Sequence, residues 1–229
     1  MIVISHRGAA GLRAENSIAA IRAGIKAGAD IIEFDVRTTK DGIPILSHDF
    51  HTVRTQKKLD FIKRHTLSEL RKRFAGSEHP IVTLDDALRE AFGKVMLNIE
   101  IKQHSAVAPT LEVLKKYIKK RSDWDTIIFS SFSVRALKAI RAAIPKAQLA
   151  MLHSLNPLAF IAHERKLRLS AVGFHRLRIT KLAVEVAKRL DLFVYVYTVN
   201  RPQALPALEK LGVDGIVTDF PNKFADPPR

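Results

Sequence analysis

Residues 30–49 read DIIEFDVRTTKDGIPILSHD, and this stretch contains the pattern that decides the fold. Apolar and charged side chains alternate over residues 32–37, which is typical of a β-strand with two different faces. Because side chains two positions apart lie on the same face of a strand, Glu33 and Asp35 point the same way, and Arg37 comes next on that face. The stretch therefore predicts a strand that carries two neighbouring carboxylates.

The same stretch turns back on itself. Asp41-Gly42 is a strong turn signal, and residues 43–48 follow too closely for a parallel crossover, which needs about a dozen residues. We therefore expect an antiparallel return that brings His48 roughly opposite Asp35. Carboxylate oxygens beside an imidazole indicate a divalent cation and a proton-transfer group.

Further strand-like segments follow along the chain and alternate with helical ones. Eight β/α units joined by short loops predict a TIM (β/α)8 barrel of the α/β class, with a doubly wound open sheet as the alternative. A chain of this length is often one such domain, so residues 1–229 are expected to form a single barrel domain. The expected strands are residues 2–6, 30–36, 95–101, 126–130, 148–153, 170–174, 192–198 and 214–218.

Capping residues mark where several helices begin. Asn16 precedes a helix whose apolar side chains recur on one face and which Gly28 ends, and Thr83 precedes another helix. Pro206 is expected to distort the last helix or to shift its start. Similar patterns predict helices at residues 133–143, 180–190 and 202–211.

One segment, residues 50–80, breaks the alternation and is rich in Lys, Arg and His. Thr66-Leu-Ser-Glu69 resembles a capping box that opens a short helix. A small insertion above the carboxyl ends of barrel strands is a natural lid or substrate-binding element. Its apolar residues interleave with the cations, which leaves open a peripheral contact with an anionic membrane. The favoured interpretation is a helix that packs on its own barrel and exposes a cationic face.

Composition excludes several classes of protein. Hydrophobic residues make up 47% of the chain, which argues against disorder, and the lack of cysteine excludes disulfides, zinc–thiolate sites and cysteine nucleophiles. No apolar run has the length of a bilayer span, and the first residues do not resemble a signal peptide, so a soluble cytoplasmic protein is expected. The net charge of +15 would attract anionic partners, although excess Lys and Arg can also serve solubility alone.

Candidate chemistry gathers where predicted strands end. The first strand ends in His6-Arg7, where the arginine offers a fixed cation suited to phosphate oxygens. In the third strand the apolar side chains face the helices, so Glu100 and Lys102 point into the barrel. An internal Glu–Lys ion pair would explain them, but three inward carboxylates on two strands favour metal ligation. Tyr197 could line a pocket or simply belong to the core.

Taken together, these motifs resemble those of the glycerophosphodiester phosphodiesterase family, in the family's order and nearly end to end. Ser17 and Tyr197 depart from the family pattern, which usually has Thr and Trp at these places. The matching motifs are His6-Arg7-Gly8, Glu15-Asn16-Ser17, Glu33-Phe34-Asp35-Val36, Thr39-Lys40-Asp41-Gly42, His48-Asp49, Asn98-Ile99-Glu100-Ile101-Lys102, Tyr197-Thr198-Val199-Asn200 and Thr218-Asp219-Phe220-Pro221.

The resemblance implies a TIM barrel with a small insertion after the hairpin, and a hydrolase of lipid and glycerol metabolism. The implied reaction converts a small anionic glycerophosphodiester into glycerol 3-phosphate and an alcohol. The resemblance also implies the site: one divalent cation, Mg²⁺ or Ca²⁺, held by Glu33, Asp35 and Glu100; His6 and His48 as the acid–base pair; Arg7 and Lys102 as phosphate contacts; and Tyr197 in the substrate pocket.

Two alternatives remain at this point. One is a lysophospholipase D-type enzyme on the same barrel, which a hydrophobic groove running into the insertion would favour. The other is a non-catalytic binder of anionic lipid or nucleic acid, driven by the positive charge. The presence of every expected acid, base and ligand argues against such a binder, and no nucleic-acid partner is expected. The sequence does not indicate an oligomeric state.

Overall fold

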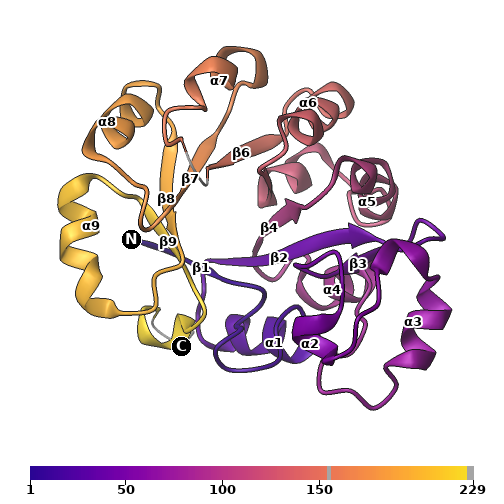
Figure 1. Ribbon diagram of the computed structural model, residues 1–229. Helices are drawn as coiled ribbons and strands as arrows, with labels where there is room; N and C mark the ends of the chain where they lie inside the picture. Colours follow the sequence, from indigo (N-terminus) through magenta and orange to yellow (C-terminus); the bar gives the residue numbers. More distant parts are fainter. Residues whose placement is uncertain (154–155, 226–229) are drawn as a thin grey trace.

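Parallel strands form a closed barrel at the centre of the computed structural model, which describes residues 1–153 and 156–225 (Figure 1). Within these residues eight strands run parallel, and the sheet closes because β1 pairs with both β9 and β2. The predicted TIM barrel is therefore confirmed. Its strands are β1 (Ile2–Ser5), β2 (Ile31–Thr38), β4 (Met96–Ile101), β5 (Ile127–Ser131), β6 (Gln148–His153), β7 (Ala171–His175), β8 (Phe193–Tyr197) and β9 (Gly215–Thr218).

Helices between the strands surround the barrel (Figure 1). The predicted start of one of them is confirmed, because the side chain of Thr83 accepts a hydrogen bond from the backbone N–H three residues on. Ser133 and Thr180 cap two more helices in the same way. The helices are α1 (Ile18–Lys26), α4 (Leu84–Ala91), α5 (Val107–Leu114), α6 (Val134–Ala143), α7 (Ile161–Leu167), α8 (Lys181–Arg189) and α9 (Leu205–Leu211).

The start of α1 differs from the prediction, and the start of α9 confirms the expected effect of Pro206. Asn16 was expected to cap α1, but Ser17 caps it, accepting from the N–H of Ala20. Asn16 instead bonds to Asp35, as described below. Pro206 lies in the first turn of α9, where its missing N–H leaves no intrahelical bond unmade, so the helix starts later than residue 202.

Apolar side chains fill two layers of the barrel. Phe34, Ile99 and Phe129 belong to the layer between strands and helices and are fully buried. A second cluster, which includes Ile31 and Val217, fills the inside of the barrel. Because inward side chains recur every second residue, the positions that follow Ile31 on the same face are the polar ones at the carboxyl end of β2. The interior therefore has an apolar floor and a polar mouth.

The hairpin of β2 and β3 (Pro44–Leu46) is present, but its register differs from the prediction. The N–H of Ser47 donates to the carbonyl of Asp35, so Ser47 rather than His48 lies opposite Asp35. The register shifts by one residue because the loop has three residues, 40–42, instead of two. Gly42 takes the left-handed conformation that such a loop requires, with φ of 76°.

The insertion of residues 50–80 lies beside this hairpin (Figure 1). Its predicted capping box is confirmed: Thr66 accepts from the N–H of Glu69, whose carboxylate accepts from the N–H of Thr66. Apolar residues of the insertion and of β3 form a small shared core, consisting of Ile45, Ile62, Leu70 and Phe74. The insertion contains α2 (Val53–Gln56), a 3-10 turn (Ile62–Arg64) and α3 (Leu67–Arg73). None of the described helices is long and apolar enough to cross a bilayer.

Candidate active site

Three carboxylates meet inside the barrel mouth, on the inward faces of β2 and β4. One oxygen from each of Glu33, Asp35 and Glu100 lies within 4.8 Å of the others. They converge because the two strands pair in a register that places Asp35 beside Glu100. Glu33 Oε1 is buried and accepts no hydrogen bond, whereas Asp35 Oδ1, also buried, lies 3.3 Å from the ammonium of Lys102. Since buried, unpartnered carboxylate oxygens are unfavourable, this arrangement suits a cation.

The three carboxylates alter one another's pKa. Burial, followed by the negative charge of Asp35, raises the pKa of Glu33 to about 8 and raises the pKa of Glu100 as well. Burial would also raise the pKa of Asp35, but the ammonium of Lys102 and the guanidinium of Arg7 outweigh it and hold that pKa well below its usual range. A divalent cation would relieve this mutual repulsion.

Two cations, Arg7 and Lys102, border the acidic cluster. Lys102 Nζ lies 2.6 Å from Glu100 Oε1 and 3.3 Å from Asp35 Oδ1. Arg7 Nε lies 3.3 Å from Asp35 Oδ2, and Arg7 Nη1 donates to both oxygens of Glu15 at 3.0 Å. The Glu–Lys ion pair weighed from the sequence is therefore present, and the same ammonium also pairs with Asp35. Both cations thus lie within ion-pair distance of the acidic cluster.

His6 is oriented by a carboxylate from the far end of the chain. Its Nδ1 lies 2.6 Å from Asp219 Oδ1, and Asn200 Nδ2 donates to the other oxygen of Asp219 at 2.6 Å. Burial would lower the pKa of His6, but the bond to Asp219 and then the charge of Glu33 outweigh burial and raise that pKa. This arrangement leaves Nε2 as the ring nitrogen that can meet a substrate.

His48 has its own carboxylate partner on the insertion side. Its Nδ1 lies 2.7 Å from Asp49 Oδ1, and Arg54 Nε of α2 donates to Asp49 Oδ2 at 2.7 Å. The guanidinium of Arg54 also bonds both oxygens of Glu15, so α2 is tied to the loop after β1. Burial lowers the pKa of His48, although the charge of Asp35 opposes this shift.

Tyr197 and His6 both line a cavity of about 40 Å³ inside the barrel mouth. The hydroxyl of Tyr197 donates to the backbone carbonyl of His153 at 2.5 Å. The rings of Tyr197 and Phe132 pack in a T-shaped arrangement, with their centroids 6.1 Å apart. These contacts fix the tyrosine at the cavity wall, next to the acidic cluster. The cavity is called the inner cavity below.

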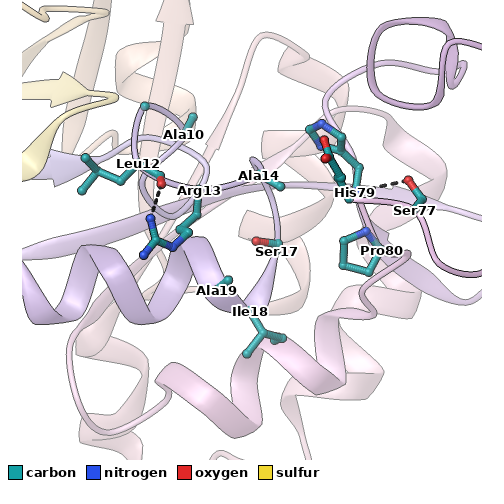
Figure 2. A pocket seen from close by; sticks show the side chains of 12 residues that line it. Ala10, Leu12, Arg13, Ala14, Ser17, Ile18, Ala19, Ser77, His79 and Pro80 are labelled. Carbon is teal, nitrogen blue, oxygen red and sulfur yellow. Dashed lines mark hydrogen bonds between the residues drawn. The ribbon is translucent and has the colours of Figure 1, made fainter.

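A larger, open hollow of about 790 Å³ lies between the loop after β1 and residues 77–80 (Figure 2). The figure shows Arg13 turned back toward the carbonyl of Leu12, and His79 bonded to Ser77. The lining of this hollow includes no residue of the acidic cluster and none of the two histidine–aspartate pairs. It therefore lacks the candidate chemistry despite its size.

The structure gives roles in the site to residues that sequence reasoning did not place there. Asn16 donates from Nδ2 to Asp35 Oδ2 at 2.9 Å and so orients an expected metal ligand. Asp219 and Asp49 orient the two histidines. Their position in matching motifs at strand ends was a usable signal. Arg54 stands in an irregular insertion outside those motifs, and no pattern in the sequence pointed to it.

Comparison with known proteins identifies the family of this chain. Residues 6–223 match the model of the glycerophosphoryl diester phosphodiesterase family. A glycerophosphodiester phosphodiesterase of Caldanaerobacter subterraneus subsp. tengcongensis is 32% identical over 237 residues, which cover 96% of this chain and 94% of that protein.

Two solved structures are also similar. A phosphodiesterase of Oleispira antarctica, in complex with the product sn-glycerol-3-phosphate, is 26% identical with a TM-score of 0.87 and covers 97% of this chain and 94% of its own. A glycerophosphodiester phosphodiesterase of Thermotoga maritima is 28% identical with a TM-score of 0.84, covering 98% and 96%.

Proposed function

The chain belongs to the glycerophosphoryl diester phosphodiesterase family, and from this premise we propose that it hydrolyses glycerophosphodiesters to glycerol 3-phosphate and an alcohol. One observation carries the proposal: two histidine–aspartate pairs stand beside a buried cluster of three carboxylates. Cleavage of a phosphodiester needs positive charge against the phosphate and two groups that move protons. The site supplies the proton carriers and the ligands for such a charge.

A divalent cation, Mg²⁺ or Ca²⁺, fits the acidic cluster. Glu33, Asp35 and Glu100 would hold it through their carboxylate oxygens, of which Glu33 Oε1 is buried without a hydrogen-bond donor. When bound, such an ion supplies charge that neutralises the phosphodiester. Arg7 and Lys102, which lie within 3.3 Å of Asp35, would contact oxygens of the same phosphate.

The two histidines, His6 and His48, divide the proton transfers. One takes the proton of the attacking hydroxyl, here the glycerol 2-hydroxyl, while its oxygen bonds to phosphorus. The other donates a proton to the alcohol oxygen whose bond to phosphorus breaks. Water then opens the resulting cyclic phosphate with the roles exchanged, which releases glycerol 3-phosphate. Asp219 and Asp49 hold Nδ1 of each ring, so Nε2 carries the transferred proton.

The test measures the release of glycerol 3-phosphate from sn-glycero-3-phosphoglycerol, with glycerol-3-phosphate dehydrogenase as the coupling enzyme. We expect a chelator to abolish the reaction and Mg²⁺ or Ca²⁺ to restore it. Glu100→Gln should lower kcat about a hundredfold or more, because a lost ligand weakens charge stabilisation by several kcal/mol. Glu112→Gln is the matched control, since that carboxylate is exposed on α5.

Two results would change the proposal. A wild-type rate for Glu100→Gln after chelation would refute the metal assignment. Faster hydrolysis of a lysophospholipid, with release of acylglycerol phosphate, would identify the lysophospholipase D-type alternative instead.

A further inference from the structure

We infer that the inner cavity is a subsite for the free primary hydroxyl of the glycerol arm, and that Asn98, Ser130 and Tyr195 recognise this group. The inference rests on the proposed function and specifies its substrate class, because it confines the enzyme to diesters whose glycerol carries no acyl chain. None of the three residues holds the candidate metal or moves a proton in the proposed mechanism.

The inner cavity borders the reacting centre. Its lining includes Glu33 and Glu100 of the acidic cluster, and also His6. Leu152 and Val217 line it as well, and both belong to the apolar cluster that fills the inside of the barrel. The cavity therefore lies between the candidate metal ligands and the apolar floor of the barrel.

Three polar side chains that line this cavity have no partner among the described residues. Asn98 Oδ1, Ser130 Oγ and Tyr195 Oη are buried without a hydrogen bond, and each of these residues is at most 3% exposed. Buried polar atoms without partners are rare in proteins and costly. One bound hydroxyl group would satisfy several of them at once.

The three side chains come from strands that lie far apart in the sequence. Asn98 stands two residues before Glu100 on β4, and Tyr195 stands two residues before Tyr197 on β8, so each shares the inward face of its strand. Ser130 of β5 pairs in register with Glu100. Closure of the barrel thus brings the three polar groups to one cavity.

Their chemistry matches an alcohol. The amide oxygen of Asn98 accepts hydrogen bonds, the hydroxyl of Tyr195 is protonated at neutral pH and can donate, and the hydroxyl of Ser130 can do either. An alcohol hydroxyl also donates one hydrogen bond and accepts others. A hydroxyl in the inner cavity can therefore meet all three groups.

The glycerol arm has one hydroxyl that is left for this cavity. In the proposed mechanism the 2-hydroxyl attacks phosphorus, and a further oxygen of glycerol bears the phosphate. The remaining primary hydroxyl is only a few bonds away from phosphorus. When the phosphate is bound at the acidic cluster, this hydroxyl can reach a cavity that Glu33 and Glu100 themselves line.

The size of the cavity limits what this oxygen can carry. A bound water needs roughly 10–15 Å³ of cavity volume, so about 40 Å³ admits a hydroxymethyl group. A long acyl chain on the same oxygen does not fit, and an ester oxygen could no longer donate to Asn98. The cavity therefore favours deacylated glycerophosphodiesters over lysophospholipids.

The test compares sn-glycero-3-phosphoethanolamine with its 1-deoxy analogue, in which a methyl group replaces the hydroxymethyl group. Both esters keep the 2-hydroxyl and the same leaving alcohol, so the bonds that form and break are the same. The readout is the ethanolamine released with Mg²⁺ or Ca²⁺ present, measured by mass spectrometry. We expect kcat/KM to be lower for the deoxy ester by about a hundredfold or more, because its methyl group leaves buried polar groups unpaired.

Tyr195→Phe and Ser130→Ala should each lower kcat/KM for the glycerol ester by about tenfold and that for the deoxy ester much less. The preference for the glycerol ester should therefore fall in both variants. Tyr117→Phe is the matched control, because its hydroxyl bonds to Asp85 of α4, outside the barrel, and its loss should keep the wild-type ratio. Melting temperatures within a few degrees of the wild type check that each variant is folded.

Binding of the two products gives a readout that does not depend on turnover. Isothermal titration calorimetry should show a Kd for 1-deoxyglycerol 3-phosphate about tenfold or more above that for glycerol 3-phosphate. Tyr195→Phe should narrow this difference, and Tyr117→Phe should not.

Equal kcat/KM for the two esters would overturn the subsite and would assign the three polar groups to a structural water. An unchanged ratio in both Tyr195→Phe and Ser130→Ala would do the same, as would hydrolysis of a 1-acyl lysophospholipid as fast as the glycerol ester. If neither ester releases ethanolamine while the two products still bind with different affinity, the proposed function is contradicted and the subsite is not.

Discussion

At the scale of single residues, His6 and His48 are one residue type in two different surroundings. We propose that His48 donates the proton to the leaving alkoxide and that His6 accepts the proton of the attacking hydroxyl. The raised pKa of His6 makes it the stronger base, and the lowered pKa of His48 makes it the stronger acid. Each shift favours the proton transfer assigned to that residue.

The dependence of the variants' rates on the leaving group tests this division of roles. His6→Ala and His48→Ala should each lower kcat about 10²–10⁴-fold on an alkyl ester, the usual contribution of acid–base catalysis. With a 4-nitrophenyl ester, whose leaving group needs no proton, His48→Ala should recover most of the lost rate of the first cleavage, measured as the 4-nitrophenolate released in a single turnover, and His6→Ala should not. His104→Ala, on an exposed turn, is the control. Equal losses of both variants on both esters would remove the assignment. Recovery in His6→Ala instead of His48→Ala would reverse it.

At the scale of elements, α2 supports the site although none of its residues belongs to the reacting centre. Arg54 links Asp49, the partner of His48, to Glu15, the partner of Arg7. The pairing is about half-exposed, so its contribution to global stability is at most about 1 kcal/mol. Its main effect is to hold two site residues in one geometry.

Removing this link should therefore affect turnover more than stability. We expect Arg54→Leu to lower kcat about tenfold or more, because small displacements of catalytic groups are costly, while the melting temperature changes by only a few degrees. Limited proteolysis should show faster cleavage within residues 50–60. Lys57→Gln, at the end of the same helix, should change neither quantity. An unchanged kcat for Arg54→Leu would leave α2 without this role.

The same elements show how far sequence alone could go. The alternation of strands and helices predicted the barrel, and the inward faces of two strands predicted the acidic cluster correctly as a group. The hairpin register was missed by one residue, because two- and three-residue loops share the Asp41-Gly42 signal. Asn16 was assigned to a cap because its contact with Asp35 is made between two different elements, which a local pattern cannot report.

At the scale of the whole molecule, the charge of +15 creates a field around the mouth. We expect kcat/KM for an anionic substrate to fall with added inert salt while kcat stays nearly constant. Lys57→Gln with Lys58→Gln, in the insertion, should flatten this dependence. Lys119→Gln with Lys120→Gln, after α5 at the opposite end of the barrel, should not. If kcat/KM of both double variants keeps the same dependence on salt, the positive charge is explained by solubility and not by attraction of the substrate.

Global stability should depend on the protonation of His153. This side chain is only 4% exposed and packs against the rings of Phe160 and Phe174. Burial, aided by the charge of His163, lowers its pKa from 6.5 to about 4. The unfolded chain thus binds the proton more tightly than the folded one, and stability is complete above pH 6.5 and is lost as the pH falls toward 4.

The loss attributable to this one group should reach about 2–3 kcal/mol at pH 4. Urea unfolding of the wild type and of His153→Leu at pH 7.5 and pH 4.5 measures it, because the other titrating groups are common to both proteins. The variant should lose less stability between the two pH values. Equal losses would show that His153 is not responsible.

The contact between His6 and Asp219 joins residues 213 positions apart, one just after the first strand and one just after the last. A chain still on the ribosome therefore carries most of its barrel before the partner of this histidine has been made. Until β9 enters between β1 and β8, the sheet is open and this proton carrier is not held. Enzymatic activity therefore requires closure of the barrel, and the recovery of activity during refolding dates that closure.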